Sequence, residues 1–309
     1  MKYFYGPVPS RRLGFSLGVD IIPVKTCSFD CVYCQVGRTT RLTTRRRSFV
    51  NIGEFTRELR AIYARRPRID YITIAGSGEP TLHKGLDSLI GIIKRETHHA
   101  YPVAVITNSS LLYQKQVRKE LLSADLIIPS LDAATRKTFN KIDRPHASVR
   151  FEKILEGLIR LRQEFKGKLW LEIMMLAGFN DSVQEWRAFK PLIAALAPEK
   201  VQINLPVRPS GAKINLPPYK KILMFKKIIG PRAQIVPGFY KETKKQFSQS
   251  VQKDLVRMLS VRPTSYPDLL NCLGLERREL DRNLRLLSTE GRIRSKMHRG
   301  KKFYTIAAR

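Results

Sequence analysis

The stretch Cys27-Ser28-Phe29-Asp30-Cys31-Val32-Tyr33-Cys34 holds three of the four cysteines of the chain. Three thiols cannot all be paired in disulfides, because one is left over, so a soft-ligand metal site is the more natural use. A structural zinc site usually takes four protein ligands, and the nearest histidine in the sequence is His83. Three ligands and one open position suit an iron–sulfur cluster that keeps one iron free for a substrate.

The spacing C-x3-C-x2-C, with the aromatic Tyr33 before the last cysteine, resembles the signature of radical S-adenosylmethionine (SAM) enzymes. Three flanking segments, residues 6–14 (GPVPSRRLG), 17–20 (LGVD) and 25–26 (KT), strengthen the likeness. Together they make roughly residues 1–240 similar to the branch of Fe–S oxidoreductases related to the wyosine-tRNA synthases. The alternative is a zinc knuckle or three buried cysteines without a function, since free cysteine is commonly buried.

The resemblance implies that Cys27, Cys31 and Cys34 hold a [4Fe-4S] cluster whose free iron binds SAM. A reduced cluster would split SAM into methionine and a 5′-deoxyadenosyl radical, which abstracts hydrogen from a substrate, so an electron donor is an implied partner. Wyosine synthases use further upstream cysteines for a second cluster, and this chain has none before Cys27. Radical methyltransferases with a methylated cysteine also need more, and only Cys272 remains. The reaction type therefore stays open.

The chain is strongly basic, with 57 Lys and Arg against 26 Asp and Glu in 309 residues, a formal net charge of +31. Solubility of a small domain asks for a charge of only about 2–8. Such a surface attracts polyanions, nucleic acid first and anionic membrane second. We therefore expect a nucleic-acid partner, RNA rather than DNA, and a lineage-wide basic bias is the alternative.

The sequence shows no sign of membrane insertion or export. Apolar runs fall short of the roughly 20 residues that span a bilayer, and residues 1–7 lack the apolar core of a signal peptide. The few cysteines, unpaired in pattern, suit a reducing compartment. We expect a cytoplasmic protein.

Short apolar runs alternate with amphipathic helical periods over the first two thirds of the chain. The expected strands are residues 18–24, 71–75, 103–106, 126–131, 169–176 and 200–205. The expected helices are residues 54–65, 86–94, 113–122, 151–165, 183–196 and 222–229. Near-continuous apolar strands between such helices indicate a parallel sheet covered by helices. Six units predict an α/β fold with a partial (β/α)6 barrel, which has fewer units than an eightfold barrel. This arrangement is similar to that of radical SAM enzymes.

Polar residues follow the expected strands, where parallel α/β folds place their chemistry. The loop Gly76-Ser77-Gly78-Glu79 allows close backbone approach at its glycines and offers a carboxylate to an ammonium group. By resemblance, Gly76, Gly78 and Glu79 hold the methionine amino group of SAM, and an ordinary solvated turn is the alternative. The other candidates, which by resemblance line SAM or the substrate chamber, are Thr107, Asn108, Ser130, Asp132, Glu172 and Asn204.

Several of these candidates have a structural alternative. Asn108 and Asp132 could equally be helix caps. Glu172 is an acid inside an apolar strand, so it must be paired or face a polar cavity. Arg144 and His146 lie in a loop that either covers the site or is solvated.

From about residue 248 the pattern changes to three short helices, expected at residues 251–259, 266–273 and 276–287, the second ended by Gly274. A basic, alternating stretch over residues 292–306 follows, and it is broken near Gly300 as in a hairpin. This order is typical of a winged helix-turn-helix. We therefore expect a radical SAM domain over residues 1–240 and a winged helix-turn-helix domain over residues 248–309.

The third of these helices has two faces. Leu280, Leu284 and Leu287 form an apolar face, and arginines at the same spacing lie on about the opposite side. Residues 241–309 carry 17 Lys and Arg against 7 Asp and Glu, or +10. The predicted nucleic-acid contacts are Arg278, Arg282, Arg285, Arg294, Lys296, Arg299 and Lys301. Peptide capture by the hairpin strand is the alternative, and Cys272 is expected in the core.

Three functions compete at this point. The first is a radical SAM enzyme that modifies RNA, with tRNA the first candidate. The second uses the same cofactors as an activase or peptide-modifying enzyme. The third is an Fe–S redox regulator that binds DNA, and the loop Gly76-Ser77-Gly78-Glu79 argues against it because a sensor needs no methionine site.

Overall fold

The computed structural model describes residues 1–210, 214–236, 251–273 and 275–307. Its main feature is a mixed sheet in the order β1-β2-β5-β6-β7-β8-β9-β10, in which only the β1–β2 pair is antiparallel. The strands are β1 Phe4–Ser10, β2 Gly14–Val19, β5 Tyr71–Ile74, β6 Val103–Thr107, β7 Leu126–Pro129, β8 Lys168–Met174, β9 Lys200–Asn204 and β10 Ala233–Ile235. Two short strands, β3 Thr26–Cys27 and β4 Arg41–Leu42, pair beside it.

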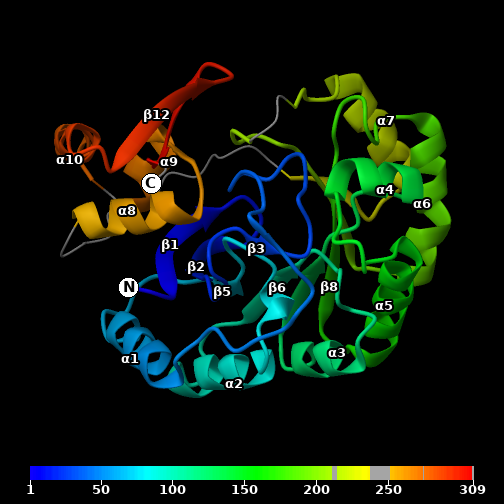
Figure 1. Ribbon diagram of the computed structural model, residues 1–309, viewed down its shortest axis with the longest axis horizontal. Helices are drawn as coiled ribbons and strands as arrows, with labels where there is room; N and C mark the ends of the chain where they lie inside the picture. The colour runs from blue at the N-terminus through cyan, green and yellow to red at the C-terminus, as the bar shows by residue number, and fades with distance from the viewer. Residues whose placement is uncertain (211–213, 237–250, 274, 308–309) are drawn as a thin grey trace.

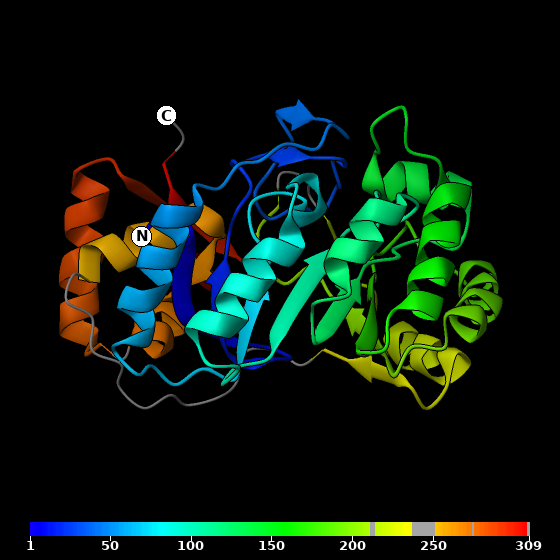
Figure 2. The same cartoon turned by 90° about the horizontal axis from the view of Figure 1, so that it is seen from below.

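Helices cover the outer side of the curved sheet (Figures 1 and 2). They are α1 Ile52–Tyr63, the 3-10 turn η1 Pro80–Leu82, α2 Leu86–Glu96, α3 Lys115–Leu121, α4 Arg136–Asp143, α5 Phe151–Glu164, α6 Val183–Leu196 and α7 Tyr219–Ile229. Polar caps define helix starts: Asn51 Oδ1 accepts from the Glu54 amide (3.0 Å) and Ser182 Oγ from the Glu185 amide (3.2 Å). In the described residues no helix combines the length and apolar character needed to cross a bilayer.

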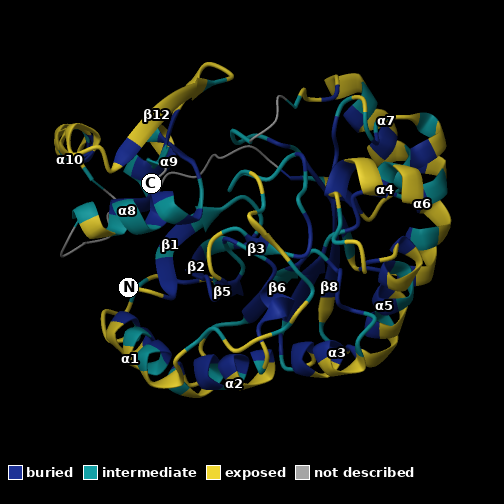
Figure 3. Cartoon of the chain, in the orientation of Figure 1, coloured by how far each residue is buried: buried dark blue, intermediate teal, exposed yellow. Residues whose placement is uncertain are grey.

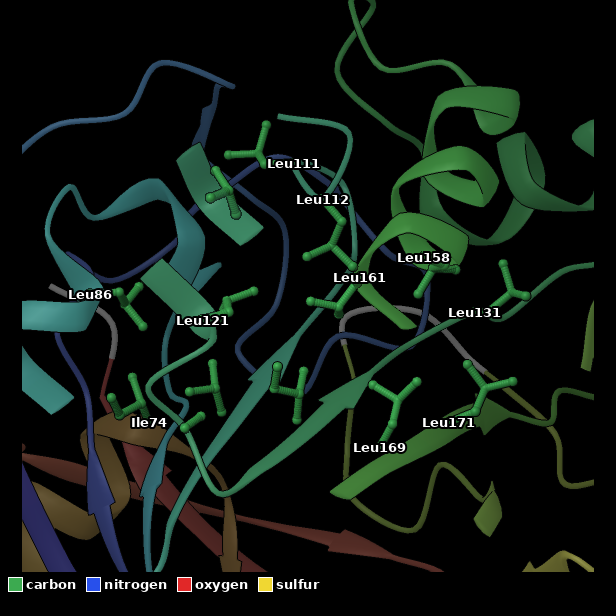
Figure 4. Packing of buried hydrophobic residues seen from close by; sticks show 14 of the residues in the cluster. Ile74, Leu86, Leu111, Leu112, Leu121, Leu131, Leu158, Leu161, Leu169 and Leu171 are labelled. Atoms are coloured by element: carbon green, nitrogen blue, oxygen red, sulfur yellow. The ribbon is translucent and has the colours of Figure 1, made fainter. Parts of the chain in front are cut away.

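The hydrophobic core lies between the sheet and these helices. Strand residues such as Ile74, Leu169 and Leu171 pack beside Leu121 of α3 and Leu158 of α5 (Figure 4). All five side chains are almost completely buried. Burial of each such side chain contributes about 1.5–3 kcal/mol to the stability of the fold. The polar residues are left at the ends of the strands.

Five of the six expected strands lie where they were predicted, whereas the first, expected at residues 18–24, is β2 Gly14–Val19 and ends where the prediction begins; the sheet is also larger than a (β/α)6 arrangement. The prediction missed the edge strands β1 and β10 and the helix α4. Proline interrupts a strand pattern yet is tolerated at a sheet edge, and β1 contains Pro7 and Pro9. Strand β10 has only three residues, and α4 carries only two apolar residues, Phe139 and Ile142, too few for a periodic signal. The fold is therefore α/β with a mixed sheet.

The C-terminal part contains α8 Val251–Val261, β11 Thr264–Ser265, α9 Tyr266–Leu273, α10 Arg277–Thr289, β12 Ile293–His298 and β13 Lys301–Ile306. Three helices and a hairpin occur in the expected order, and β11 joins the hairpin in a sheet of order β11-β13-β12. We call residues 251–307 the C-terminal unit. Gly274 and the expected boundary between residues 240 and 248 lie outside the described residues.

The C-terminal unit packs on the edge strand β1 (Figure 1). Tyr5 and Val8 of β1 belong to the same buried cluster as Leu255, Leu269 and Leu284. Arg257 Nε donates to the Phe4 carbonyl at 3.2 Å. The unit therefore covers a sheet edge that would otherwise present unpaired backbone groups and apolar side chains to solvent.

Candidate active site

A cavity of about 320 Å³ lies where the parallel strands end. Eleven of the twelve predicted metal and cofactor residues line it, and Asp132 is the exception. The eleven are Cys27, Cys31, Cys34, Gly76, Gly78, Glu79, Thr107, Asn108, Ser130, Glu172 and Asn204. The structure therefore brings these eleven residues together around one cavity.

Backbone hydrogen bonds fix the cysteine loop against the end of α4. The amides of Asp30 and Val32 donate to the carbonyls of Asp143 (3.0 Å) and Ile142 (2.9 Å). The amide of His146 donates to the Ser28 carbonyl at 2.9 Å. The segment that we expected to cover the site or to be solvated instead supports the cysteine loop.

The three thiols are half-buried on the cavity wall. Cys31 Sγ donates to Asp143 Oδ1 at 3.3 Å, and Asn108 Nδ2 donates to Cys27 Sγ at 3.5 Å. Burial, assisted by Glu79, raises the pKa of Cys27 to about 12, and burial also raises the pKa of Cys31 and of Cys34. A bound metal would offset this cost because it stabilises the thiolate form.

The donor set on this wall fits an iron–sulfur cluster with one open iron better than a closed zinc site. In the described parts of the chain, no group of three or more His, Cys, Asp or Glu side chains is already arranged to hold a metal ion. The three cysteines line one cavity, whereas His83 is not part of its lining. Three sulfur donors with an adjoining cavity match a cluster that binds a further ligand.

The glycines after β5 allow two loops to touch. A Cβ on Gly78 would lie 2.0 Å from the Thr26 carbonyl oxygen, and one on Gly76 would lie 2.3 Å from Asp20 Oδ1. The Ser77 hydroxyl donates to Asp20 Oδ2 at 2.6 Å. These residues therefore pack the β5 loop against the segment that leads into Cys27, as well as facing the cavity.

The Glu79 carboxylate joins the ends of β5 and β6. Its Oε1 accepts from the Thr81 amide (3.0 Å) and from the hydroxyls of Thr81 and Thr107 (both 2.6 Å). Its Oε2 accepts from the Asn108 amide at 2.7 Å. Burial raises the pKa of Glu79, and these hydrogen bonds oppose that rise. Each carboxylate oxygen has about two acceptor positions, so the three donors on Oε1 share its positions, whereas Oε2, with one donor, keeps one position for an ammonium group.

Glu172 on β8 forms an ion pair with Arg12 from the β1–β2 turn, and both residues line the cavity. Arg12 also donates to Gln202 Oε1 at 3.1 Å. The requirement that a strand acid be paired or face a polar cavity is therefore met in both ways.

Asp132 and Asn108 act on loops and are not caps of regular helices. Asp132 Oδ2 accepts from the Tyr33 hydroxyl, and Asp132 Oδ1 accepts from the Met174 amide at 2.7 Å. Burial raises the pKa of Asp132 to about 6. Asn108 Oδ1 accepts from the Ser110 amide at 3.0 Å. Asp132 thus holds two residues of the cavity lining, Tyr33 and Met174, without lining the cavity itself.

Two further candidates present polar groups at strand ends. The Ser130 carbonyl accepts from the Ser109 hydroxyl at 2.7 Å, and Asn204 Oδ1 accepts from the Leu205 amide at 2.9 Å. The sequence analysis missed cavity residues that come from turns and from the C-terminal unit. They are Arg11, Arg12, Gln35 and Arg262, and Tyr5 of β1 was missed as well; Arg208 also lines the cavity and follows the sixth expected strand, where the resemblance placed it. A basic pair in a turn was the available signal for Arg11 and Arg12.

The predicted basic surface divides into two parts. Arg278, Arg282 and Arg285 of α10 are exposed while the three leucines of that helix are buried, and Figure 3 shows the exposed stretches of α10 and β12. Arg294, Lys296 and Lys301 of the hairpin are exposed as well. The guanidinium of Arg299 instead donates to the carbonyls of Pro206 (3.1 Å) and Ile214 (2.9 Å), and so connects the hairpin to the segment after β9.

His83, which follows the turn η1 next to Glu79, makes the stability of the fold depend on pH. It is 2% exposed, its Nδ1 accepts from the Phe49 amide at 3.1 Å, and burial lowers its pKa from 6.5 to about 4. Between about pH 6.5 and pH 4, His83 is protonated in the unfolded chain but stays neutral in the folded chain. The free energy of unfolding therefore falls as the pH drops toward 4. We expect the urea midpoint to fall over this range.

The variant His83→Gln provides the comparison, because its side-chain oxygen can accept from the same amide. Buried acids with raised pKa values, such as Glu79, contribute with the opposite sign in both proteins. The difference in urea midpoint between the two proteins therefore isolates His83. An identical dependence on pH in both proteins would contradict this assignment.

Comparison with known proteins gives consistent matches over most of the chain. A sequence profile of the radical SAM superfamily matches residues 21–189. A UPF0026 protein of Methanocaldococcus jannaschii is 34% identical over 311 residues, which cover 98% of this chain and 96% of that protein. A protein of Brachyspira hyodysenteriae named GTPase Obg is 36% identical over 309 residues, which cover 99% of this chain but only 45% of that protein.

More distant similarity extends to an enzyme named for tRNA and to a solved structure. The S-adenosyl-L-methionine-dependent tRNA 4-demethylwyosine synthase TYW1 of Danio rerio is 21% identical over 220 residues, or 65% of this chain and 28% of that protein. The crystal structure of a radical SAM methyltransferase from Sphaerobacter thermophilus aligns with a TM-score of 0.55 and 17% identity, over 71% of this chain and 65% of that chain. The structural likeness shows a shared fold.

Proposed function

Because the chain belongs to the radical SAM superfamily and, within it, is a relative of the UPF0026 proteins, we propose that it cleaves SAM reductively at a [4Fe-4S] cluster and modifies RNA, tRNA being the first candidate. The observation that carries the proposal is that all three cysteines and the Gly76-Ser77-Gly78-Glu79 loop share one cavity. When bound, the cluster and SAM supply the electron and the radical that abstracts hydrogen from the substrate. The protein positions them and excludes side reactions.

Each candidate residue has a specific part in this proposal. Cys27, Cys31 and Cys34 hold the cluster. The backbone at Gly76 and Gly78 approaches SAM closely, and the remaining acceptor position of Glu79 receives its amino group. Polar groups for the ribose, carboxylate and adenine of SAM or for the substrate come from Thr107, Asn108, Ser130, Glu172 and Asn204. Asp132 acts indirectly, since it fixes Tyr33.

The choice of RNA rests on charge and on the C-terminal unit. The chain carries a formal charge of +31, and exposed arginines follow one face of α10. Three helices followed by a basic hairpin favour a winged helix-turn-helix, and we keep residues 1–240 and 248–309 as the two proposed domains. The distant similarity to a tRNA 4-demethylwyosine synthase points to the same class of substrate.

The test is anaerobic reconstitution of the protein with iron and sulfide, followed by dithionite and SAM. We expect formation of 5′-deoxyadenosine, faster when bulk tRNA is added and slower again as salt is raised, because phosphate contacts weaken with salt. No 5′-deoxyadenosine from protein with a complete, reducible cluster would refute the enzyme proposal. Turnover that tRNA does not affect would refute the RNA part alone.

A further inference from the structure

Strand β4 carries exposed side chains that lie directly beside the first cysteine of the cysteine loop. Strands β3 and β4 pair in parallel, with Leu42 opposite Cys27 and Arg41 opposite Thr26. The Thr43 amide also donates to the Cys27 carbonyl at 2.9 Å. Because paired strands lie about 4.8 Å apart, Leu42, which is 39% exposed, brings solvent-accessible surface within one strand spacing of Cys27.

This surface is reached without entering the cavity. None of residues 37–48, all of which the structure describes, lines the cavity, whereas Cys34 and the two residues after it do. Figure 2 shows the short blue strands β3 and β4 at the upper margin of the molecule, well separated from α10. SAM and the substrate would occupy the cavity when the cluster needs an electron. A donor that approaches β4 avoids both of them.

The basic side chains of residues 38–47 divide into four that are exposed and one that is not. The guanidinium of Arg46 turns inward, where it donates to Glu120 at 3.1 Å and to the carbonyls of Thr81 and His83 at 2.8 Å each. It therefore anchors the segment that carries its exposed neighbours. The exposed residues, which we call the β4 surface, are Arg38, Arg41, Leu42, Arg45 and Arg47.

The β4 surface carries an excess of positive charge. The only acid between residues 23 and 48 of the sequence is Asp30. Its Oδ1 accepts from the Thr39 amide at 2.7 Å, and its Oδ2 lies 4.0 Å from Arg38 Nε. Four arginines of this segment are thus accompanied by one carboxylate. Such an excess attracts an acidic partner and speeds its association.

From this arrangement we propose that the β4 surface docks a small acidic protein that carries a one-electron redox centre near its own surface. Electron transfer slows steeply with distance, so a donor has to bind where exposed residues lie close to a cluster ligand, and Leu42 meets this condition. In the step itself the donor loses one electron and the cluster gains it, and no bond is made or broken. Redox partners of this kind bind through small, weak interfaces that charge complementarity guides.

This inference deepens the proposed function and rests on it for the presence of a cluster on Cys27, Cys31 and Cys34. RNA is the other polyanion that exposed arginines attract. The position of the β4 surface favours the redox protein, because the target base of an RNA has to enter the cavity, and no residue of this surface lines it. The apolar Leu42 at the point nearest to Cys27 also suits a protein interface.

The experiment measures how fast the cluster of the reconstituted protein is reduced, from the loss of its visible absorption in anaerobic stopped flow. The reductants are a reduced plant-type [2Fe-2S] ferredoxin, which is an acidic protein, and dithionite, which is a small molecule. The variants are Leu42→Glu and Arg41→Gln. The control is Arg57→Gln, at an exposed position on α1.

We expect Leu42→Glu to slow reduction by ferredoxin about tenfold or more and Arg41→Gln to slow it about threefold, because complementary charge sets the rate of association. The control should react like the wild type. Dithionite should reduce all four proteins at the same rate, since it needs no docking surface. Added salt should slow the reaction of ferredoxin with the wild type more than with Arg41→Gln.

Equal rates with ferredoxin in Leu42→Glu and Arg57→Gln would overturn the proposal. That result differs from failure of the proposed function, which would appear as a cluster that dithionite reduces without formation of 5′-deoxyadenosine. The reduction assay contains neither SAM nor RNA, so its outcome does not depend on turnover.

A second measurement uses only the wild type and so covers variants that do not fold. Hydrogen exchange of the reconstituted protein is followed by mass spectrometry with oxidised ferredoxin, with bulk tRNA and with neither. We expect ferredoxin to slow exchange in peptides that cover residues 38–48 and to leave α10 unchanged. Protection of residues 38–48 by tRNA but not by ferredoxin would assign the β4 surface to RNA and refute the proposal.

Discussion

Replacing Cys31 with alanine is expected to reduce the iron content of reconstituted protein to background and to abolish 5′-deoxyadenosine formation. Three protein thiolates are the minimum for a cluster with one open iron, and Cys31 is the middle one of the three that line the cavity. Iron and sulfide analysis, the visible absorption spectrum and the SAM cleavage assay measure the effect. A Cys31→Ala protein that keeps its iron and its turnover would contradict our ligand assignment.

The fold should survive this change. The cysteine loop is held by main-chain hydrogen bonds of Asp30, Val32 and Cys34, and none of them uses the Cys31 side chain. Near-ultraviolet circular dichroism of the metal-free proteins should therefore be the same. The matched control is Cys272→Ala, in the core of the C-terminal unit. It should bind iron and cleave SAM like the wild type. Loss of iron in this variant would mean that removing any cysteine of the chain disturbs iron binding, and the loss in Cys31→Ala would then not identify Cys31 as a ligand.

A Gly78→Ala substitution is expected to have the second largest effect on iron binding and SAM cleavage, because the added methyl group would clash with the segment that leads into the cysteine loop. The added Cβ would lie 2.0 Å from the Thr26 carbonyl oxygen and 2.6 Å from Ile22 Cγ2. The first contact is with backbone, which cannot rotate away, so the segment that precedes Cys27 must shift. Overpacking of this kind costs about 1–3 kcal/mol and more where backbone must move, and the three thiols lose their common arrangement.

We expect Gly78→Ala to lower the urea midpoint and to lose most of its iron and SAM cleavage. Gly91→Ala on α2 is the control, because the nearest atom to the added methyl group is the flexible end of Arg95 at 3.3 Å. Alanine is favoured over glycine inside a helix by up to about 1 kcal/mol, so this control should be as stable as the wild type or more so. If the two variants behave alike, the close approach of the two loops is not what holds the cysteine loop.

The alternation of apolar runs and helical periods predicted five of the six inner parallel strands and placed α6 at its observed bounds, Val183–Leu196, but it placed β2 too late in the chain. The same periodicity cannot detect β1, because prolines interrupt it and its partners in the core, such as Leu255, lie at the other end of the chain. Local pattern identifies elements that pack against their sequence neighbours. Pairings between distant segments leave no local trace.

The candidate site shows the same division. Residues directly after a strand, such as Glu79 and Asn108, were predictable because parallel strands end on one side of a sheet. Asp132 also follows a strand, yet its side chain turns toward Tyr33, and the direction of a loop side chain has no sequence signal. Arg262 reaches the cavity only because the C-terminal unit packs on β1, so it could not be inferred from spacing, whereas Arg208 follows β9 as the other candidates follow their strands.

The packing of the C-terminal unit on β1 also bears on how the protein is made. Strand β1 precedes the rest of the large sheet in the chain, and its partners in the shared core, which lie within residues 251–306, follow that sheet, so they are synthesised well after β1. Chains are synthesised at about 5–20 residues per second, so the apolar side of β1 remains uncovered while the intervening sheet is being made. Uncovered edge strands are sites of aggregation, so we expect β1 to be prone to aggregation until the C-terminal unit has been synthesised.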